Sequence, residues 1–240
     1  MEILQKMFLR LWRFLKNMNK YTVIISGGAL DEKFVTDILK SEETELIIGA
    51  DHGLVFLHEH GILPDYIVGD FDSTPEEIIS YYRENTKIPI RKFNPVKDVS
   101  DTESALRLGL ELGRKRILLV GATGSRADHL WANVQCLKIA LDAGADARIV
   151  DSYNRIRLLD QGIVLKKQEA YGPYFSVFPL SGTVLDFNIR GAKYPLCHHV
   201  LTPYDSLCVS NEFAEDEVEI SFPLGEVILM ETRDVPKDTK

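Results

Sequence analysis

The stretch "DYIVGDFDSTPEEIISYYRE" (65–84) decides the fold, because it contains a strand signal, a loop and a helix signal in that order. The apolar run at 66–69 is short and rich in β-branched residues, as expected for a buried strand. Thr74 then supplies a capping hydroxyl, and Pro75 fits the first position of a helix. The stretch therefore predicts a β-loop-α unit.

The loop of this unit carries two aspartates only two positions apart, Asp70 and Asp72. Like charges so close together repel each other, and two explanations compete. The first is a solvated turn after a strand. The second is a metal site that needs both carboxylates.

The same alternation of short apolar runs and amphipathic stretches continues outward from this unit, between residues 21 and 151. It predicts a doubly wound, mostly parallel α/β sheet with flanking helices. The predicted strands are 21–26, 45–50, 66–69, 88–93, 116–121 and 147–151. The predicted helices are 31–40, 52–60, 75–84, 101–113 and 128–143.

Beyond about residue 153 the helical periodicity disappears, and short alternating segments separated by Gly, Pro and Asn take over. Strands at this spacing predict a C-terminal all-β sandwich. They are "RIRLL", "IVLKK", "YFSVFPL", "TVLDFNI", "DSLCVS", "EVEISF" and "GEVILME". We therefore expect two domains, 20–152 and 153–240, preceded by a basic amphipathic segment (1–19) that is a helical extension or a leader.

Composition excludes several classes of protein. The net charge of −8 argues against non-specific nucleic-acid binding, which depends on lysines and arginines. No apolar run approaches the ~20 residues of a membrane-spanning helix. The three cysteines have no CxxC spacing, so neither a disulfide framework nor a zinc site is indicated, and a cytoplasmic location is expected.

Acidic residues follow the predicted strands at their carboxyl ends. In a parallel sheet these ends meet at one edge, and ligands bind in the crevice outside it. We therefore expect six aspartates to converge there: Asp51, Asp70, Asp72, Asp98, Asp101 and Asp128.

So many carboxylates raise one another's pKa values unless cations lie among them. Lys97 and Arg126 supply part of the positive charge, and Mg²⁺, which prefers a few carboxylates together with phosphate oxygens, fits the remainder. Glycines after the strands, among them Gly28, allow main-chain N–H groups to approach phosphate. The pattern predicts a magnesium-nucleotide site without a Walker-type loop.

Each of these residues also has a plain structural explanation. A lone aspartate after a strand is more often a helix cap than a ligand, and both Asp101 and Asp128 open predicted helices. Lys97 and Arg126 could pair with neighbouring acids. The functional interpretation depends on the convergence of all these residues at one edge.

Four ordered motifs resemble the thiamin pyrophosphokinase (thiamin diphosphokinase) family. They are "GADHGLVFLHEHGILPDYIVGDFDS" (49–73), "KDVSDTESAL" (97–106), "GATGSRADHLWANVQCL" (121–137) and "GAKYPLCHHVLTPYDSLCVSNE" (191–212). The resemblance implies transfer of the pyrophosphoryl group of ATP to the hydroxyethyl group of thiamin, giving thiamin diphosphate and AMP. It also implies a homodimer in which thiamin lies between the α/β domain of one subunit and the β domain of the other.

The resemblance also implies roles for individual residues. The expected metal ligands are Asp70, Asp72 and Asp101. The expected catalytic residues are these three with Asp98, Arg126 and Asp128. The expected ATP- and thiamin-binding residues are Gly28, Asp51, Lys97, Ser100, Thr123, Ser210 and Asn211.

Two other functions stay open. One is a pyrophosphokinase that acts on a different alcohol, such as a hydroxymethylpterin. The other is a non-catalytic protein that binds a nucleotide or thiamin.

Overall fold

The computed structural model describes residues 20–92 and 99–236. The predicted N-terminal extension and the candidate site residues Lys97 and Asp98 lie outside these ranges. The chain divides into two compact units, one up to Ala147 and one from Arg148 on. The sequence pattern placed this division slightly later, after residue 152.

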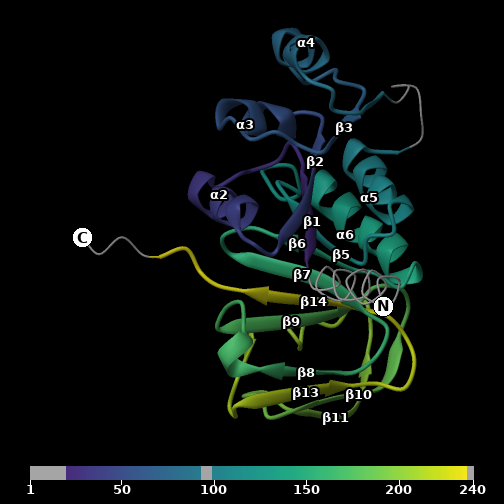
Figure 1. Cartoon of the computed structure of the whole chain (residues 1–240). Helices are drawn as coiled ribbons and strands as arrows, with labels where there is room; N and C mark the ends of the chain where they lie inside the picture. Colours follow the sequence, from purple (N-terminus) through teal and green to yellow (C-terminus); the bar gives the residue numbers. More distant parts are fainter. Residues whose placement is uncertain (1–19, 93–98, 237–240) are drawn as a thin grey trace, which may run out of the picture. The chain divides into compact units, whose positions relative to one another are not determined.

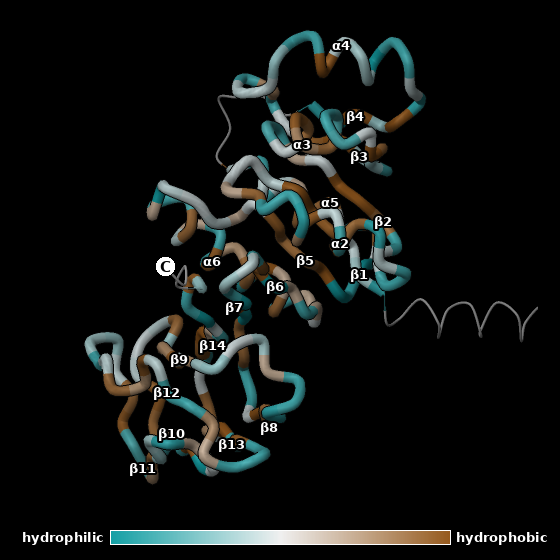
Figure 2. Tube along the Cα trace, turned by 90° about the vertical axis from the view of Figure 1, so that its left-hand side faces the viewer, coloured by the Kyte–Doolittle hydropathy of each residue, from teal (hydrophilic) through white to brown (hydrophobic). Residues whose placement is uncertain are grey.

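A parallel sheet forms the centre of the first unit, in the order β5-β1-β2-β3-β4 (Figure 1). Register places Val23 beside Leu118 on one side and beside Ile47 on the other. β2 and β5 are largely apolar along their length (Figure 2). The strands are β1 (Tyr21–Ile25), β2 (Thr44–Ala50), β3 (Tyr66–Gly69), β4 (Ile90–Lys92) and β5 (Arg116–Val120).

Helices lie on both sides of this sheet, with α2 and α3 on one side and α5 and α6 on the other (Figure 1). The doubly wound prediction is confirmed. The helices are α2 (Glu32–Lys40), α3 (Gly53–Glu59), α4 (Glu76–Asn85), α5 (Asp101–Glu111) and α6 (Ala127–Asp142). Across residues 20–92 and 99–236, every helix falls short of the length and apolarity that crossing a membrane requires.

One predicted helix start is wrong in detail. α4 begins one residue later than expected, with Pro75 as its N-cap, and no side chain caps it. The Thr74 hydroxyl instead donates to Asp51 Oδ1 at 3.2 Å. The Thr74 hydroxyl thus holds the neighbouring acidic loop, and α4 begins without a side-chain cap.

The second unit is β-rich and contains two antiparallel sheets, one in the order β12-β9-β14-β7-β6 and the other β11-β10-β13-β8. Phe175 and Leu229 from the first sheet and Phe187 and Ile220 from the second share one buried apolar core, which makes the unit a sandwich. The strands are β6 (Asp146–Val150), β7 (Asn154–Leu159), β8 (Ile163–Lys166), β9 (Tyr174–Pro179), β10 (Val184–Arg190), β11 (Leu196–Leu201), β12 (Asn211–Glu212), β13 (Glu217–Ser221) and β14 (Val227–Thr232), with a short 3₁₀ helix at Lys167–Glu169.

Two predictions in this unit are wrong. The segment "DSLCVS" (205–210) forms turns, because Asp205 Oδ1 accepts the Leu207 N–H at 2.8 Å and the Val209 N–H donates to the Ser206 carbonyl. Such local bonds compete with strand pairing. β11 was missed, since its residues alternate poorly and half of them are exposed.

Candidate active site

Three carboxylates from different loops meet at the edge of the parallel sheet. Asp51 directly follows β2, Asp70 directly follows β3, and Asp101 opens α5. One oxygen from each lies within 4.8 Å of the others, and all three residues are partly buried. The predicted convergence therefore holds for these three residues.

The loop after β3 takes its shape from a buried phenylalanine. The strand ends at Gly69, and Phe71 has a φ of +67° with only 9% of its surface exposed. A non-glycine residue at positive φ is uncommon, and here burial of the ring stabilises it.

Asp51 is held by hydroxyl groups from the loop after β3. Both Ser73 and Thr74 donate their hydroxyls to its carboxylate. Asp51 itself has a φ of +44°, a conformation that aspartate tolerates better than most residues. The loop after β3 thus supplies Asp70 and also orients the carboxylate that follows β2.

Asp72 lies beside this group of three carboxylates. Its main-chain N–H donates to Asp70 Oδ1 at 3.0 Å, and its side chain is exposed. The Asp70 carboxylate raises the pKa of Asp72 above its usual range. Asp72 was predicted as a metal ligand on the basis of family resemblance, and this role stays a prediction.

Charge in the group is poorly balanced. Burial raises the pKa of Asp101 to about 6, and the carboxylates of Asp51 and Asp70 add to the rise. Three oxygens this close favour a bound cation over three mutually repelling anions. Hard oxygen ligands of this kind suit Mg²⁺, so the donor set fits the predicted metal.

A cavity of about 540 Å³ opens beside the carboxylates. It is lined by Asp51 and Asp101, by the glycine-containing loops after β1 and β5, and by the start of α6. The two glycine loops touch, because the Gly28 N–H donates to the Gly121 carbonyl at 2.7 Å. A Cβ on Gly28 would lie 2.2 Å from the Thr123 carbonyl oxygen, so this contact requires glycine.

Arg126 and Asp128 form an ion pair at the start of α6. Arg126 Nη2 lies 2.5 Å from Asp128 Oδ2, and this bond lowers the pKa of Asp128 to about 2. Arg126 lines the cavity and precedes the first turn of a sixteen-residue helix. The positive end of that helix and the guanidinium together favour an anion.

Gly53 fixes the start of α3 against the end of β1, and we expect Gly53→Ala to destabilise the protein by about 2 kcal/mol. A Cβ there would lie 2.1 Å from the Ile25 carbonyl oxygen, which is main chain and cannot rotate away. Urea unfolding measures the change. In the control Gly109→Ala, the new Cβ meets side chains and no main chain, the nearest being Ile117 at 3.3 Å. Equal losses in the two variants would contradict the steric explanation.

The other predicted site residues have varied surroundings. Ser100 caps α5 by accepting the Glu103 N–H at 3.2 Å, and the Thr123 carbonyl accepts the Ala29 N–H at 2.7 Å. In the second unit, Ser210 is exposed at a φ of +55°.

The side chain of Asn211 is buried and engaged locally. Its Oδ1 accepts the N–H groups of Tyr194 and Glu212, and its Nδ2 donates to the Tyr194 carbonyl at 2.8 Å. These bonds hold the chain next to Tyr194, whose ring is about half exposed. The side chain of Asn211 therefore holds the neighbouring main chain in place.

Some contributions to the site were missed. Asp51 was expected to converge with the other aspartates but was assigned to substrate binding and not to the metal, and its carboxylate lies with those of Asp70 and Asp101. Thr74 was predicted as a helix cap and Ser73 was given no role, whereas the hydroxyls of both donate to Asp51. His52 was given no role in the site, whereas its Nδ1 lies 3.0 Å from the Ser73 carbonyl oxygen and ties the two acidic loops together.

Comparison with known proteins matches both units of the chain. The family model "Thiamin pyrophosphokinase, catalytic domain" matches residues 39–149, and the model "Thiamin pyrophosphokinase, vitamin B1 binding domain" matches residues 161–225. The thiamine pyrophosphokinase of Bacillus subtilis (strain 168) is 31% identical over 212 residues, which cover 88% of this chain and 98% of that protein.

Solved structures agree with these matches. The crystal structure of the Bacillus subtilis thiamine pyrophosphokinase superimposes with a TM-score of 0.80 at 30% identity, covering 90% of this chain and 100% of that chain. The yeast thiamin pyrophosphokinase, at 18% identity and a TM-score of 0.73 over 91% of this chain and 90% of its own, shares the fold. On the matches to both of its units and to a full-length relative, the chain belongs to the thiamin pyrophosphokinase family.

Proposed function

We propose that this protein is an enzyme that transfers the pyrophosphoryl group of ATP to thiamin. The hydroxyethyl oxygen of thiamin forms a bond to the β-phosphorus, the bond from that phosphorus to the oxygen bridging it to the α-phosphorus breaks, and AMP leaves. The observation that carries the proposal is the group of three carboxylates beside a glycine-lined cavity, in a chain of this family. Such chemistry depends mainly on positioning and on neutralising charge.

Asp51, Asp70 and Asp101 are the residues we propose to hold Mg²⁺, with Asp72 as a further candidate ligand. When bound, the metal neutralises phosphate charge and orients the phosphate oxygens. The protein contributes the fixed placement of the ligands. Ser73 and Thr74 hold Asp51 by hydrogen bonds, which limits the reorganisation that binding requires.

ATP is proposed to bind in the cavity of about 540 Å³. This volume falls within the roughly 300–1,000 Å³ of typical small-molecule sites. Main-chain N–H groups near Gly124 and at the start of α6, together with Arg126, would stabilise the negative charge of the phosphates. Asp72 and Asp98 are the two candidates for the base that accepts the proton of the attacking alcohol.

Thiamin is proposed to bind with the help of Ser210 and Asn211, and the protein to act as a cytoplasmic homodimer. Support comes from the match of residues 161–225 to a model of a vitamin B1 binding domain. Thiamin is a cation. The net charge of −8 and the exposed acidic loops favour its approach.

The activity is tested directly by mixing the purified protein with ATP, Mg²⁺ and thiamin. We expect thiamin diphosphate and AMP in equal amounts, and no turnover after chelation of the metal. A panel of other acceptor alcohols, including a hydroxymethylpterin, tests specificity. Release of ADP, or AMP formation that does not depend on thiamin, would show that the proposed reaction is wrong.

The homodimer is tested by sedimentation of the full chain at micromolar concentration. We expect a mass near twice the 27.2 kDa of one chain. A monomer with full activity would contradict the proposal that two subunits share the thiamin site, but it would not contradict the proposed reaction.

A further inference from the structure

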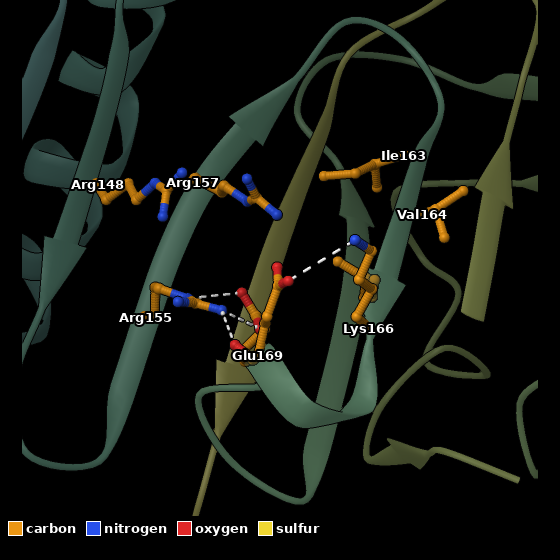
Figure 3. Close-up of a pocket in the computed structure, with 9 residues that line it drawn as sticks. Arg148, Arg155, Arg157, Ile163, Val164, Lys166 and Glu169 are labelled. Carbon is orange, nitrogen blue, oxygen red and sulfur yellow. Dashed lines mark hydrogen bonds and ion pairs between the residues drawn. The ribbon is translucent and has the colours of Figure 1, made fainter. Parts of the chain in front are cut away.

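Side-chain bonds hold the segments in which the chain of the second unit crosses from one sheet of the sandwich to the other. One such crossing follows β8 and begins with the 3₁₀ helix at Lys167–Glu169 (Figure 3). There Arg155 donates to the Glu169 carbonyl at 3.2 Å, and Lys166 pairs with the Glu169 carboxylate at 3.7 Å. This crossing contains no residue with a role in the proposed reaction.

A second crossing leads directly to the residues proposed to bind thiamin. β11 ends at Leu201 in one sheet, and Asn211 begins β12 in the other, where it pairs with Phe175 of β9. The segment between them, the crossing loop (202–210), forms turns. Ser210 is its last residue, so the conformation of the crossing loop sets the position of Ser210.

A histidine–aspartate pair holds the first half of the crossing loop to β11. His199 Nε2 lies 2.5 Å from Asp205 Oδ2, and the two side chains are only 25% and 18% exposed. The other oxygen, Oδ1, accepts the Leu207 N–H at 2.8 Å. These bonds lower the pKa of Asp205 below its usual range, the Leu207 N–H most and His199 next. Asp205 therefore links β11 to the middle of the loop through both of its oxygens.

The second half of the crossing loop is held to β9, in the other sheet. Cys208 is buried in the core of the sandwich, and its carbonyl accepts the Val177 N–H at 3.2 Å. The Ser210 N–H donates to the Ser176 hydroxyl at 3.0 Å. The loop is thus attached to one sheet near its start and to the other at its end.

The crossing loop exposes apolar side chains next to Ser210. Tyr204 is almost fully exposed, and Leu207 and Val209 are about half exposed. Apolar surface beside a few polar groups is typical of small-molecule sites, and it suits thiamin, which has two flat rings and an amino group. The positions of these side chains depend on how the first half of the loop is held.

We propose that His199 and Asp205 are positioning residues for thiamin, because their bond holds the crossing loop in the conformation that binds it. This inference rests on the proposed function, since it takes thiamin as the ligand beside Ser210. If the loop were in place in only a fraction of the molecules, the apparent affinity would fall by that fraction. ATP is proposed to bind in the first unit, so its binding is expected to stay unchanged.

Two substitutions of His199 that differ by one methylene group test this role. In glutamine, Nε2 lies about where the histidine Nε2 lay and can still donate to Asp205, whereas asparagine is too short to reach it. We expect His199→Asn to raise KM for thiamin about tenfold, the effect of losing one hydrogen bond to a charged group. His199→Gln is expected to recover most of this loss. In both variants kcat and KM for ATP should stay near the wild-type values.

The matched control is His198→Asn. His198 also pairs with an aspartate, Asp186 of β10, at 2.5 Å, but the two side chains are 79% and 50% exposed and the pair lies outside the crossing loop. His198 has a φ of +50°, which asparagine tolerates well. We therefore expect the control to keep the wild-type KM for thiamin.

Hydrogen exchange of the full chain measures the loop itself, without the reaction. We expect faster exchange of the amides of 205–210 in His199→Asn, and wild-type exchange in His199→Gln and His198→Asn. Sedimentation compares the mass of each variant with that of the wild type. A mass that changes in His199→Asn would place the effect in assembly and overturn the proposal.

The results decide the proposal in either direction. A higher KM for thiamin in His199→Asn, reversed in His199→Gln and accompanied by faster exchange of the loop, supports it. An unchanged KM for thiamin, a rise that His199→Gln shares in full, or an equal rise in KM for ATP would overturn it. If the wild type forms no thiamin diphosphate, the proposed function is wrong instead, and exchange of the loop still shows whether the pair holds it.

Discussion

Replacing Asp101 by asparagine is expected to lower kcat/KM for thiamin diphosphate formation by about a thousandfold, without loss of the fold. Asp101 is one of the three partly buried residues of the carboxylate group and lines the proposed ATP cavity. Asparagine keeps the size of the side chain and removes its charge. The proposed metal then loses one of three anionic ligands, and the charge on the transferred phosphates is less well neutralised.

We also expect Asp101→Asn to change the thermal stability of the protein. Without metal, Asp101→Asn is expected to unfold at a higher temperature than the wild type, because it removes repulsion from Asp51 and Asp70. With Mg²⁺, the wild type gains stability by binding and the variant gains much less. Thermal unfolding with and without Mg²⁺ measures both effects.

The matched control is Asp37→Asn, which removes an exposed carboxylate paired with Lys33 on α2. We expect its activity and its response to Mg²⁺ to equal those of the wild type. Near-normal turnover in Asp101→Asn would contradict the proposed role. Asp72→Asn, compared in the same assay, distinguishes a metal ligand, which loses the Mg²⁺ response, from a residue that acts only in turnover.

Replacing Glu231 by glutamine is expected to reduce the free energy of unfolding by about 3 kcal/mol, at the lower end of the range for breaking a buried ion pair. The Glu231 side chain is 3% exposed, while that of Arg155 is 20% exposed and keeps some solvation. Glutamine fills the same space but leaves the Arg155 guanidinium without a charged partner between β7 and β14. Urea unfolding measures the loss, since a salt denaturant would screen charges.

The control for this prediction is Glu219→Gln. Glu219 pairs with Arg190 at 3.7 Å, and the two side chains are 48% and 75% exposed. Exposed pairs contribute about 0.2 to 1 kcal/mol at most, so we expect little change. If Glu231→Gln reduced the free energy of unfolding no more than this control does, burial would not govern the strength of the pair.

Most of the α/β unit was predictable because local signals there agree with the fold. The run at 66–69 became β3, Asp31 and Ser100 cap α2 and α5, and Gly113 has a φ of +74° after the end of α5. In the second unit, side chains contribute less to the choice of strand. β11 and the turns at 205–210 were misassigned there. Strand pairing decides the first and a local side-chain hydrogen bond of Asp205 decides the second, and neither produces a simple alternation of polar and apolar residues.

The sequence by itself determined the parallel sheet and the edge at which its acidic residues collect, because the carboxyl ends of parallel strands necessarily share one side. Tertiary structure alone decided which carboxylates meet. Asp51 joins Asp70 and Asp101 because hydroxyls from the loop after β3 orient it, and Asp72 projects outward because Phe71 is buried. Tertiary structure also placed the arginines of β6 and β7 opposite each other, since strand register depends on long-range pairing that no local pattern encodes.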